Sequence, residues 1–347
     1  MALFPRLLAG TALLALTAVP AAAQSLVISN WDGYMPADLL DRFTEATGIA
    51  AEVSVHATNE EIMGRLVAGG GAGFDVVFVS SPFAEALNAL GLAATLDPAL
   101  IPNAANLYAE AQALEYDPGN TFSMPYAWGT TGLCYRSDRV ADAPDSWDAL
   151  LTPADDVAGS VTMLSTDRWL MAAGLLSLGH SVNTTDPAEI QAARDVLIGA
   201  TGTLLAFDDT TFYSRLVSGE STLAHAWDGW CNYGTAENAD ILFVVPGEGS
   251  DLWVDTMVVM ANSENLEAAH AFIDFVLDAD NHRWVAENIL YKVPNEAAMA
   301  GLDPALIEAF PNLGMTPDAL LAMEQLRDLG ETQRDYTRAV TEIMAAQ

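Results

Sequence analysis

Residues 25–81, SLVISNWDGYMPADLLDRFTEATGIAAEVSVHATNEEIMGRLVAGGGAGFDVVFVSS, decide the fold class. The first seven residues, SLVISNW (25–31), are typical of a strand. The next segment is typical of a helix that ends at Gly48, because apolar residues recur on one of its faces. These residues are Leu39, Leu40, Phe43 and Ala46.

The same alternation repeats through the rest of the segment. A strand from Glu52 to His56 precedes a helix whose expected N-cap is Asn59, and FDVVFVSS (74–81) is a third strand. Strands that alternate with helices predict a parallel α/β sheet. Such sheets bind ligands beyond the carboxyl ends of their strands, which here read NWDGY (30–34) and VSSPF (79–83).

A second α/β block begins near GTTGLCYRSDRV (129–140) and ends with ILFVVPGEGS (241–250). Its expected strands and helices fall within 160–169, 186–200, 204–209 and 221–234. The next strand, which carries Asp255, is expected to return to the first block. Since no Pro-rich linker separates the blocks, we expect two lobes that are joined by several short crossings, with a ligand cleft between them.

Composition narrows the possible partners. The 347 residues are 51% hydrophobic, which suits a large core and favours two domains. Thirteen Lys and Arg against 47 Asp and Glu give a formal net charge of −34. A surface of this sign repels phosphates, so no nucleic acid partner is expected.

The N-terminal segment is typical of a secretory signal peptide over residues 1–23. Arg6 precedes an apolar run from Leu7 to Val19, and small residues lead to an expected cleavage after Ala23. The run is too short to span a bilayer, and no later stretch reaches the roughly 18 to 20 apolar residues of a membrane helix. We therefore expect a periplasmic protein without a lipid anchor.

Cys134 and Cys231 are the two cysteines of the chain. In an oxidising compartment they could form a disulfide, and two buried apolar thiols are the alternative. The five histidines show no paired metal spacing, so neither a metal nor another cofactor is expected.

GSDLWVDTMVVMA (249–261) reads as a buried strand, yet it places the carboxylate of Asp255 two residues after Trp253. A buried carboxylate without a partner loses much of its hydration free energy, so Asp255 is expected to face the cleft and to bind a cation. A salt bridge to a basic residue such as Lys292 is the alternative. Other aromatic residues also fall at expected strand ends or loop starts, namely Trp31, Tyr34, Trp128, Trp227 and Tyr291.

Several motifs together resemble the periplasmic solute-binding proteins of ABC importers, specifically the spermidine/putrescine-binding branch. They include ISNWDGYMPADLLDRFTEATGI (28–49), SMPYAWGTTGLCYRSD (123–138), LWVDTMVVMANSEN (252–265) and YKVPN (291–295). The resemblance implies an α/β two-lobed periplasmic-binding-protein fold of type II. It also implies a monomeric receptor, not an enzyme, that closes on a polyamine and delivers it to an inner-membrane ABC permease. We expect the first lobe to comprise 24–130 plus 254–277, and the second 131–253 plus 278–347.

The resemblance also implies a set of ligand-binding residues. Trp31 and Tyr34 match an aromatic clamp, Ser80 a polar contact, and Asp255 the carboxylate that holds an amine. The remaining matches are lining positions: Trp227, Trp253, Tyr291 and Gln333.

Two departures concern the acidic and aromatic contacts. Pro82 occupies an expected aromatic position, with Phe83 beside it. Asp167 aligns with an expected aspartate, but the glutamate three residues later is Trp169 or is deleted. Possible substitutes for the missing acid are Asp32, Asp209 and Asp228, and solvated surface aspartates are the alternative reading of each.

Other functions stay open at this point. The missing acid would also suit a solute with one amine, such as a 4-aminobutyrate-like or quaternary ammonium compound. A secreted hydrolase is the competing class, although VSSPF (79–83) and VSGESTL (217–223) lack the GxSxG motif.

Overall fold

The structure is a computed structural model that describes residues 25–140 and 142–347, so the expected signal peptide and its cleavage after Ala23 lie outside the described residues. Within these ranges, ten strands form one curled sheet in the order β2-β1-β3-β9-β4-β7-β5-β6, with β10 beside β9 and β8 beside β4. The strands are β1 (Ser25–Trp31), β2 (Ala50–His56), β3 (Val76–Ser80), β4 (Met124–Arg136), β5 (Val161–Met163), β6 (Leu204–Phe207), β7 (Leu223–Trp227), β8 (Ile241–Val244), β9 (Asp251–Val259) and β10 (Glu324–Gln325).

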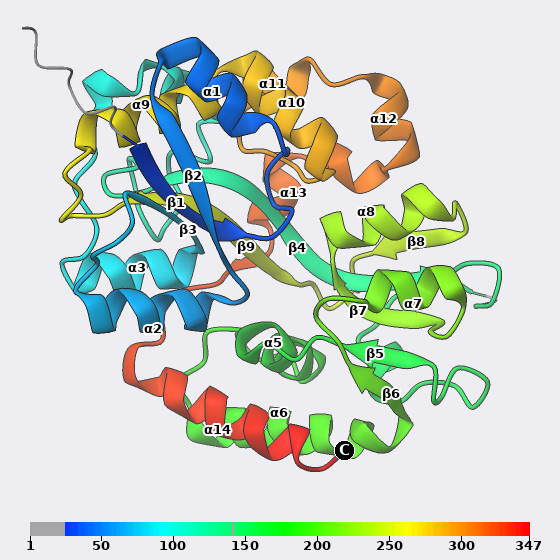
Figure 1. Cartoon of the computed structure of the whole chain (residues 1–347). Coiled ribbons are helices and arrows are strands. Elements are labelled where there is room, and N and C mark those ends of the chain that lie inside the picture. Colours follow the sequence, from blue (N-terminus) through cyan, green and yellow to red (C-terminus); the bar gives the residue numbers. More distant parts are fainter. Residues whose placement is uncertain (1–24, 141) are drawn as a thin grey trace, which may run out of the picture.

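Helices surround the strands in two groups, which form two lobes (Figure 1). In the first lobe, α1 and α9 lie above the strands in this view, and α2 and α3 lie below them. The helices are α1 (Leu39–Thr47), α2 (Asn59–Gly69), α3 (Ser81–Ala89), α4 (Asp148–Leu151), α5 (Asp167–Ser177), α6 (Pro187–Ala200), α7 (Phe212–Ser218), α8 (Asp228–Glu237), α9 (Leu266–Leu277), α10 (Ala279–Ile289), α11 (Glu296–Ala300), α12 (Pro304–Ala309), α13 (Pro317–Leu321) and α14 (Gln333–Met344).

The expected parallel arrangement of the first three strands is confirmed. β1 pairs in parallel with β2, which sets Trp31 opposite His56, and it also pairs in parallel with β3. Helix α1 ends where expected, because Gly48 adopts a φ of 75° and its N–H donates to the carbonyl of Thr44. The carboxyl ends of β1, β2 and β3 therefore lie at the same edge of the sheet.

The expected N-cap of α2 is wrong by one residue. Thr58, not Asn59, caps the helix, since the Thr58 side chain accepts a hydrogen bond from the N–H of Glu61. Asn59 is the first helical residue, and its side chain instead bonds to Ser80. The cap thus frees the Asn59 amide for a contact with the neighbouring strand end.

The long strand β4 belongs to both lobes. It pairs with β9 as far as Thr130, and from Thr131 onward it pairs with β7. The chain returns between β8, which pairs with the second half of β4, and β9, which pairs with β3. Two crossings therefore run side by side beneath the gap between the lobes.

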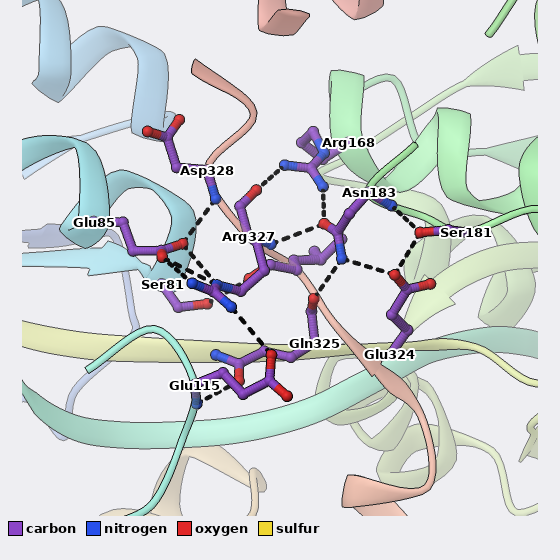
Figure 2. A network of polar contacts seen from close by, with 11 residues as sticks. Ser81, Glu85, Glu115, Arg168, Ser181, Asn183, Glu324, Gln325, Arg327 and Asp328 are labelled. Atoms are coloured by element: carbon purple, nitrogen blue, oxygen red, sulfur yellow. Dashed lines mark hydrogen bonds and ion pairs between the residues drawn. The ribbon is translucent and has the colours of Figure 1, made fainter. Parts of the chain in front are cut away.

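A third crossing lies around Arg327, and Figure 2 shows its polar contacts. The Arg327 guanidinium donates to the carboxylate of Glu85 on α3 at 2.7 Å. The backbone carbonyl oxygen of Arg327 accepts from the Arg168 guanidinium on α5 at 2.6 Å. Arg168 also donates to the side-chain oxygen of Asn183 at 2.7 Å. One residue thus joins the first lobe through its side chain and the second lobe through its backbone.

The contacts of the C-terminal quarter differ from the expected boundary, which assigns all of 278–347 to the second lobe. Only Asp278 separates α9 from α10, so α10 packs against α9, and His282 Nε2 lies 2.9 Å from the carbonyl oxygen of Tyr126. The Asn295 side chain donates to the carbonyl of Leu277. In contrast, α14 packs on α5 and α6 of the second lobe.

Cys134 and Cys231 form a disulfide with a Cα–Cα distance of 5.8 Å, which decides between the two alternatives left open by the sequence. The bond ties β4 to α8 within the second lobe, across a sequence separation of 97 residues.

Among the residues that the structure describes, no helix has the length and hydrophobicity needed to cross a bilayer.

Candidate functional site

A cavity of about 560 Å³ lies between the two lobes. Its size falls within the range of roughly 300–1,000 Å³ that is usual for small-molecule sites. The first lobe contributes the ends of its parallel strands, and the second contributes the loops that precede its helices. The lining residues are Trp31, Asp32, Tyr34, Val55, His56, Ala57, Thr58, Asn59 and Ser80 from the first lobe, Thr166, Trp169, Asp209, Thr210, Trp227 and Trp230 from the second, and Trp253, Asp255 and Tyr291.

Asp255 is the carboxylate at the centre of the site. The register between β3 and β9 sets it opposite Ser80, whose Oγ donates to Asp255 Oδ1 at 2.6 Å. Tyr34 Oη donates to Asp255 Oδ2 at 2.7 Å. A carboxylate can accept about four hydrogen bonds, so roughly two acceptor positions are left for a ligand.

The electrostatic environment of Asp255 is unfavourable for an unpaired charge. Desolvation raises its pKa to about 6, although the hydrogen bonds from Ser80 and Tyr34 act in the opposite direction. Within the described ranges, Asp255 forms no salt bridge with Lys, Arg or His. A desolvated carboxylate that lacks a basic partner favours a bound cation.

A second layer of contacts fixes the Ser80 hydroxyl. Asn59 Nδ2 donates to Ser80 Oγ at 3.1 Å, and Asn59 Oδ1 accepts from the Ser80 backbone N–H at 3.0 Å. This pair of bonds holds the carboxyl end of β3 against the first turn of α2. The hydroxyl therefore remains aimed at Asp255 without any ligand.

Aromatic rings surround Asp255. The ring of Tyr34 makes edge-on contacts with Trp31 and Tyr291, at centroid distances of 5.4 and 5.3 Å. Tyr291 in turn contacts Trp253 at 5.6 Å. Ring faces in such a cluster can cover a methylene chain and attract a cation.

Two glycines make room for these rings. A Cβ atom at Gly129 would lie 2.3 Å from the Trp253 ring, and one at Gly229 would lie 2.4 Å from the Tyr291 ring. Real Cβ atoms do not approach other atoms so closely. The absence of a side chain at both positions therefore lets β4 and α8 pack directly beneath the cavity.

A second aromatic wall comes from the other lobe. Trp169 contacts Trp227 edge-on at 5.6 Å, and Trp227 contacts Trp230 at 6.3 Å. Trp169 lies in the first turn of α5, whereas Trp227 and Trp230 flank the start of α8. A ligand in the cavity can thus touch rings of both lobes at once.

Lys292 does not pair with Asp255, so the alternative salt bridge is wrong. Its Nζ instead donates to Asp228 Oδ2, and both side chains are buried. The backbone N–H of Gly229 donates to the other oxygen of Asp228 at 2.9 Å. Asp228 is therefore neutralised within the protein and is excluded as the substitute for the missing acid.

The structure brings together most of the residues that the sequence singled out. Those that line the cavity are Trp31, Asp32, Tyr34, Ser80, Asp209, Trp227, Trp253, Asp255 and Tyr291. Three others are not among the lining residues. Phe83 packs against the hydrophobic core, and Asp167 accepts hydrogen bonds from Thr337 at 2.5 Å and from Gln333 at 3.5 Å. These contacts hold Asp167 of α5 against α14, the helix to which Gln333 and Thr337 belong.

Several lining residues were missed. The sequence marks Trp169 only as the place of a lost acid. Trp230 is found from the sequence only as the second tryptophan of AWDGW (226–230), and it lies in the first turn of α8. The sequence indicates Asn59 only as a cap, whereas in the structure it lines the cavity and positions Ser80.

A ring-lined cavity between two α/β lobes, with a carboxylate at its centre, is the arrangement of a solute-binding protein. Residues 38–309 match the family described as bacterial extracellular solute-binding protein. The chain is 32% identical to the putrescine/cadaverine-binding protein of Pseudomonas aeruginosa over 342 residues, which cover 95% of this chain and 96% of that protein. It is also 32% identical to the spermidine/putrescine-binding periplasmic protein of Escherichia coli, covering 91% of this chain and 88% of that protein.

The fold is also similar to solved structures of related proteins. A putative spermidine/putrescine ABC transporter from Listeria monocytogenes matches with a TM-score of 0.86 and 30% sequence identity, covering 93% of this chain and 100% of that chain. The chain therefore belongs to the family of bacterial extracellular solute-binding proteins. The expected two-lobed periplasmic-binding-protein fold is confirmed.

Proposed function

We propose that this protein is a periplasmic receptor that binds a polyamine of the putrescine or spermidine type between its lobes and delivers it to an inner-membrane ABC importer. The observation that carries the proposal is Asp255, a desolvated carboxylate in a cavity walled by aromatic rings, with no basic partner among the residues that the structure describes. The names of the relatives support the same class of ligand.

The geometry supports different roles for the carboxylate and for the aromatic rings of the site. One ammonium group of the ligand donates to the free acceptor positions of Asp255, where Ser80 and Tyr34 already fix the carboxylate. The methylene chain packs on the rings of Trp31 and Trp253. A cation over an aromatic face gains about 0.5 to 2 kcal/mol, which adds to the ion pair.

Binding is coupled to lobe closure in this proposal. A ligand shifts the equilibrium toward a closed form only if it has more contacts there than in the open form. Tyr34 and Asp255 on one side, with Trp227 on the other, supply contacts in both lobes. The permease then recognises the surface of the closed form.

We propose four further properties, which the sequence and the membership of the family support. The protein is exported with a signal peptide that is cleaved after Ala23, and it acts as a monomer. It performs no catalysis and binds no nucleic acid.

A thermal-shift screen tests the ligand class. Putrescine, spermidine, 4-aminobutyrate, choline and glucose are each added to the purified protein. A ligand that binds only the folded state at 100 times its Kd adds about 2.7 kcal/mol to the free energy of unfolding. We expect stabilisation by putrescine or spermidine, with the amine recovered unchanged by mass spectrometry. Stabilisation by glucose alone, or chemical conversion of the amine, would contradict the proposal.

A further inference from the structure

Besides Asp255, two aspartates line the cavity: Asp32, whose side chain is exposed, and Asp209, which is half-buried in the loop that follows β6 in the second lobe. Asp209 Oδ1 accepts from the backbone N–H of Ser165 at 2.7 Å and from Thr166 Oγ1 at 3.2 Å. Its Oδ2 accepts from Ser165 Oγ. Three of about four acceptor positions are therefore occupied, which fixes the carboxylate and leaves one position on Oδ2.

Nothing in the described part of the chain neutralises this charge. The salt bridges of the second lobe involve other acids, such as Asp208 with Arg215, and none of them includes Asp209. Two aromatic residues that line the same side of the cavity, Trp169 and Trp227, complete its surroundings. A fixed carboxylate beside indole rings is a suitable environment for a cation.

Two further acids, Glu60 and Asp167, lie near Asp209, although neither lines the cavity. Desolvation raises the pKa of Glu60, and the charges of Asp167 and Asp209 contribute to the same shift. Glu60 belongs to α2 of the first lobe, whereas Asp167 and Asp209 belong to the second. A negatively charged ligand group is therefore disfavoured at this end.

We infer that Asp209 forms a second ammonium subsite, so that the ligand is a linear amine with one ammonium group at Asp255 and another at Asp209. The inference rests on the proposed function, and it identifies the specificity-determining residue of that same site. Asp209 supplies the acidic contact whose position in the sequence is occupied by Trp169. Asp209 lies in the loop after β6 and Trp169 lies on α5, and both belong to the second lobe.

This assignment decides between the alternative solutes. The carboxylate of a 4-aminobutyrate-like compound would lie against Asp209 if its amine bound Asp255, and the two like charges would repel each other. A quaternary ammonium compound lacks the N–H groups that the free oxygen positions of Asp255 and Asp209 require. Both classes are therefore expected to bind more weakly than a diamine of similar length.

The test compares putrescine with n-butylamine, which has the same carbon chain and only one amine. Dissociation constants are measured by calorimetry, or by thermal shift at millimolar ligand, for the wild type and for Asp209→Asn. Asparagine keeps an oxygen for the N–H of Ser165, so the loop is expected to retain its structure. We expect Asp209→Asn to weaken putrescine by about 10- to 100-fold and to change n-butylamine by about twofold or less.

Asp167→Asn is the matched control, because it removes an equal charge near Glu60 from a residue that does not line the cavity. It should leave the ratio of the two affinities unchanged. If Asp209→Asn leaves that ratio as it is in the wild type, or if Asp167→Asn lowers it equally, the second subsite is refuted. Failure of the proposed function differs from both results, since the wild type would then bind neither amine.

Discussion

Ser80 and Asp255 lie 175 residues apart in the sequence, yet they are opposite each other on β3 and β9 and share a hydrogen bond of 2.6 Å. The Asp255 carboxylate is thus fixed by the register of a sheet, and not by a loop. Its partner Tyr34 follows β1, which pairs with the other side of β3. Three neighbouring strands therefore preorganise the proposed ammonium site.

The affinity for an amine is expected to depend on pH through Asp255. Desolvation raises the pKa of Asp255 to about 6 in the ligand-free cavity. The ammonium binds the ionised form, so affinity should fall as the pH drops below about 6, and binding near that pH should release a proton. Titrations at pH 6 in two buffers with different protonation enthalpies will show this as different apparent binding enthalpies.

At pH 8 the two buffers should give the same enthalpy, because Asp255 is then already ionised. Asp255→Asn should remove the buffer dependence at pH 6 wherever binding is still measurable. Equal enthalpies for the wild type at pH 6 would contradict the assignment.

The ligand-free protein should become more stable when Asp255 is replaced by Asn. A carboxyl group whose pKa is higher in the folded than in the unfolded state opposes folding once the pH rises above both pKa values. Asp255→Asn should therefore add about 1 kcal/mol to the free energy of unfolding at pH 7. This value is reduced for screening by solvent, because the side chain is only half-buried.

Near pH 4 this gain should disappear, since Asp255 is then protonated in the folded state. Urea unfolding at both pH values measures the difference. A loss of stability at pH 7 would show that the carboxylate contributes to the fold instead of opposing it.

Gly129→Ala should damage both stability and binding. The added Cβ would lie 2.3 Å from the Trp253 ring and 2.5 Å from Asp228 Oδ1, so it must displace a ring that lines the cavity. Overpacking of this kind costs about 1–3 kcal/mol. Gly64→Ala is the matched control, because nothing lies within 4 Å of its added Cβ in α2. Urea unfolding should separate the two variants, and equal stabilities would contradict the packing described here.

Lys292→Met should leave Asp228 as a buried, unpaired charge. Removing one partner of a buried ion pair costs about 3–5 kcal/mol. Addition of Asp228→Asn should recover a large part of that free energy of unfolding, whereas addition of Asp255→Asn should recover no more than it adds to the wild type. If Asp255→Asn rescued the stability and Asp228→Asn did not, the result would indicate an ion pair between Lys292 and Asp255 and would contradict the structure.

Local patterns were sufficient to predict much of the fold. The apolar periodicity of 25–81 gives the parallel strands and α1 with its end at Gly48, and 186–200 gives α6. The pairing of Cys134 with Cys231 depends on β4 lying beside α8, which no local pattern encodes. The position of α10 depends in the same way on its packing against α9.

The site was predictable where a residue type and a strand end coincided, as for Asp255 and Trp31. It was not predictable where competition between partners decides the outcome. Asp228 and Asp209 look alike in the sequence, but Lys292 neutralises the first, whereas the second lines the cavity. Asp167 begins a helix beside the cavity, and hydrogen bonds from Thr337 and Gln333 hold it against α14.

The central claim is that Asp255 binds an ammonium group of the ligand, and calorimetric titration of the wild type and Asp255→Asn with putrescine at pH 7.5 tests it most directly. Loss of the carboxylate that pairs with the ammonium group predicts a Kd that rises at least about 100-fold, in a variant whose ligand-free melting temperature equals or exceeds that of the wild type. An unchanged Kd would contradict the account, because the ammonium group would then bind elsewhere.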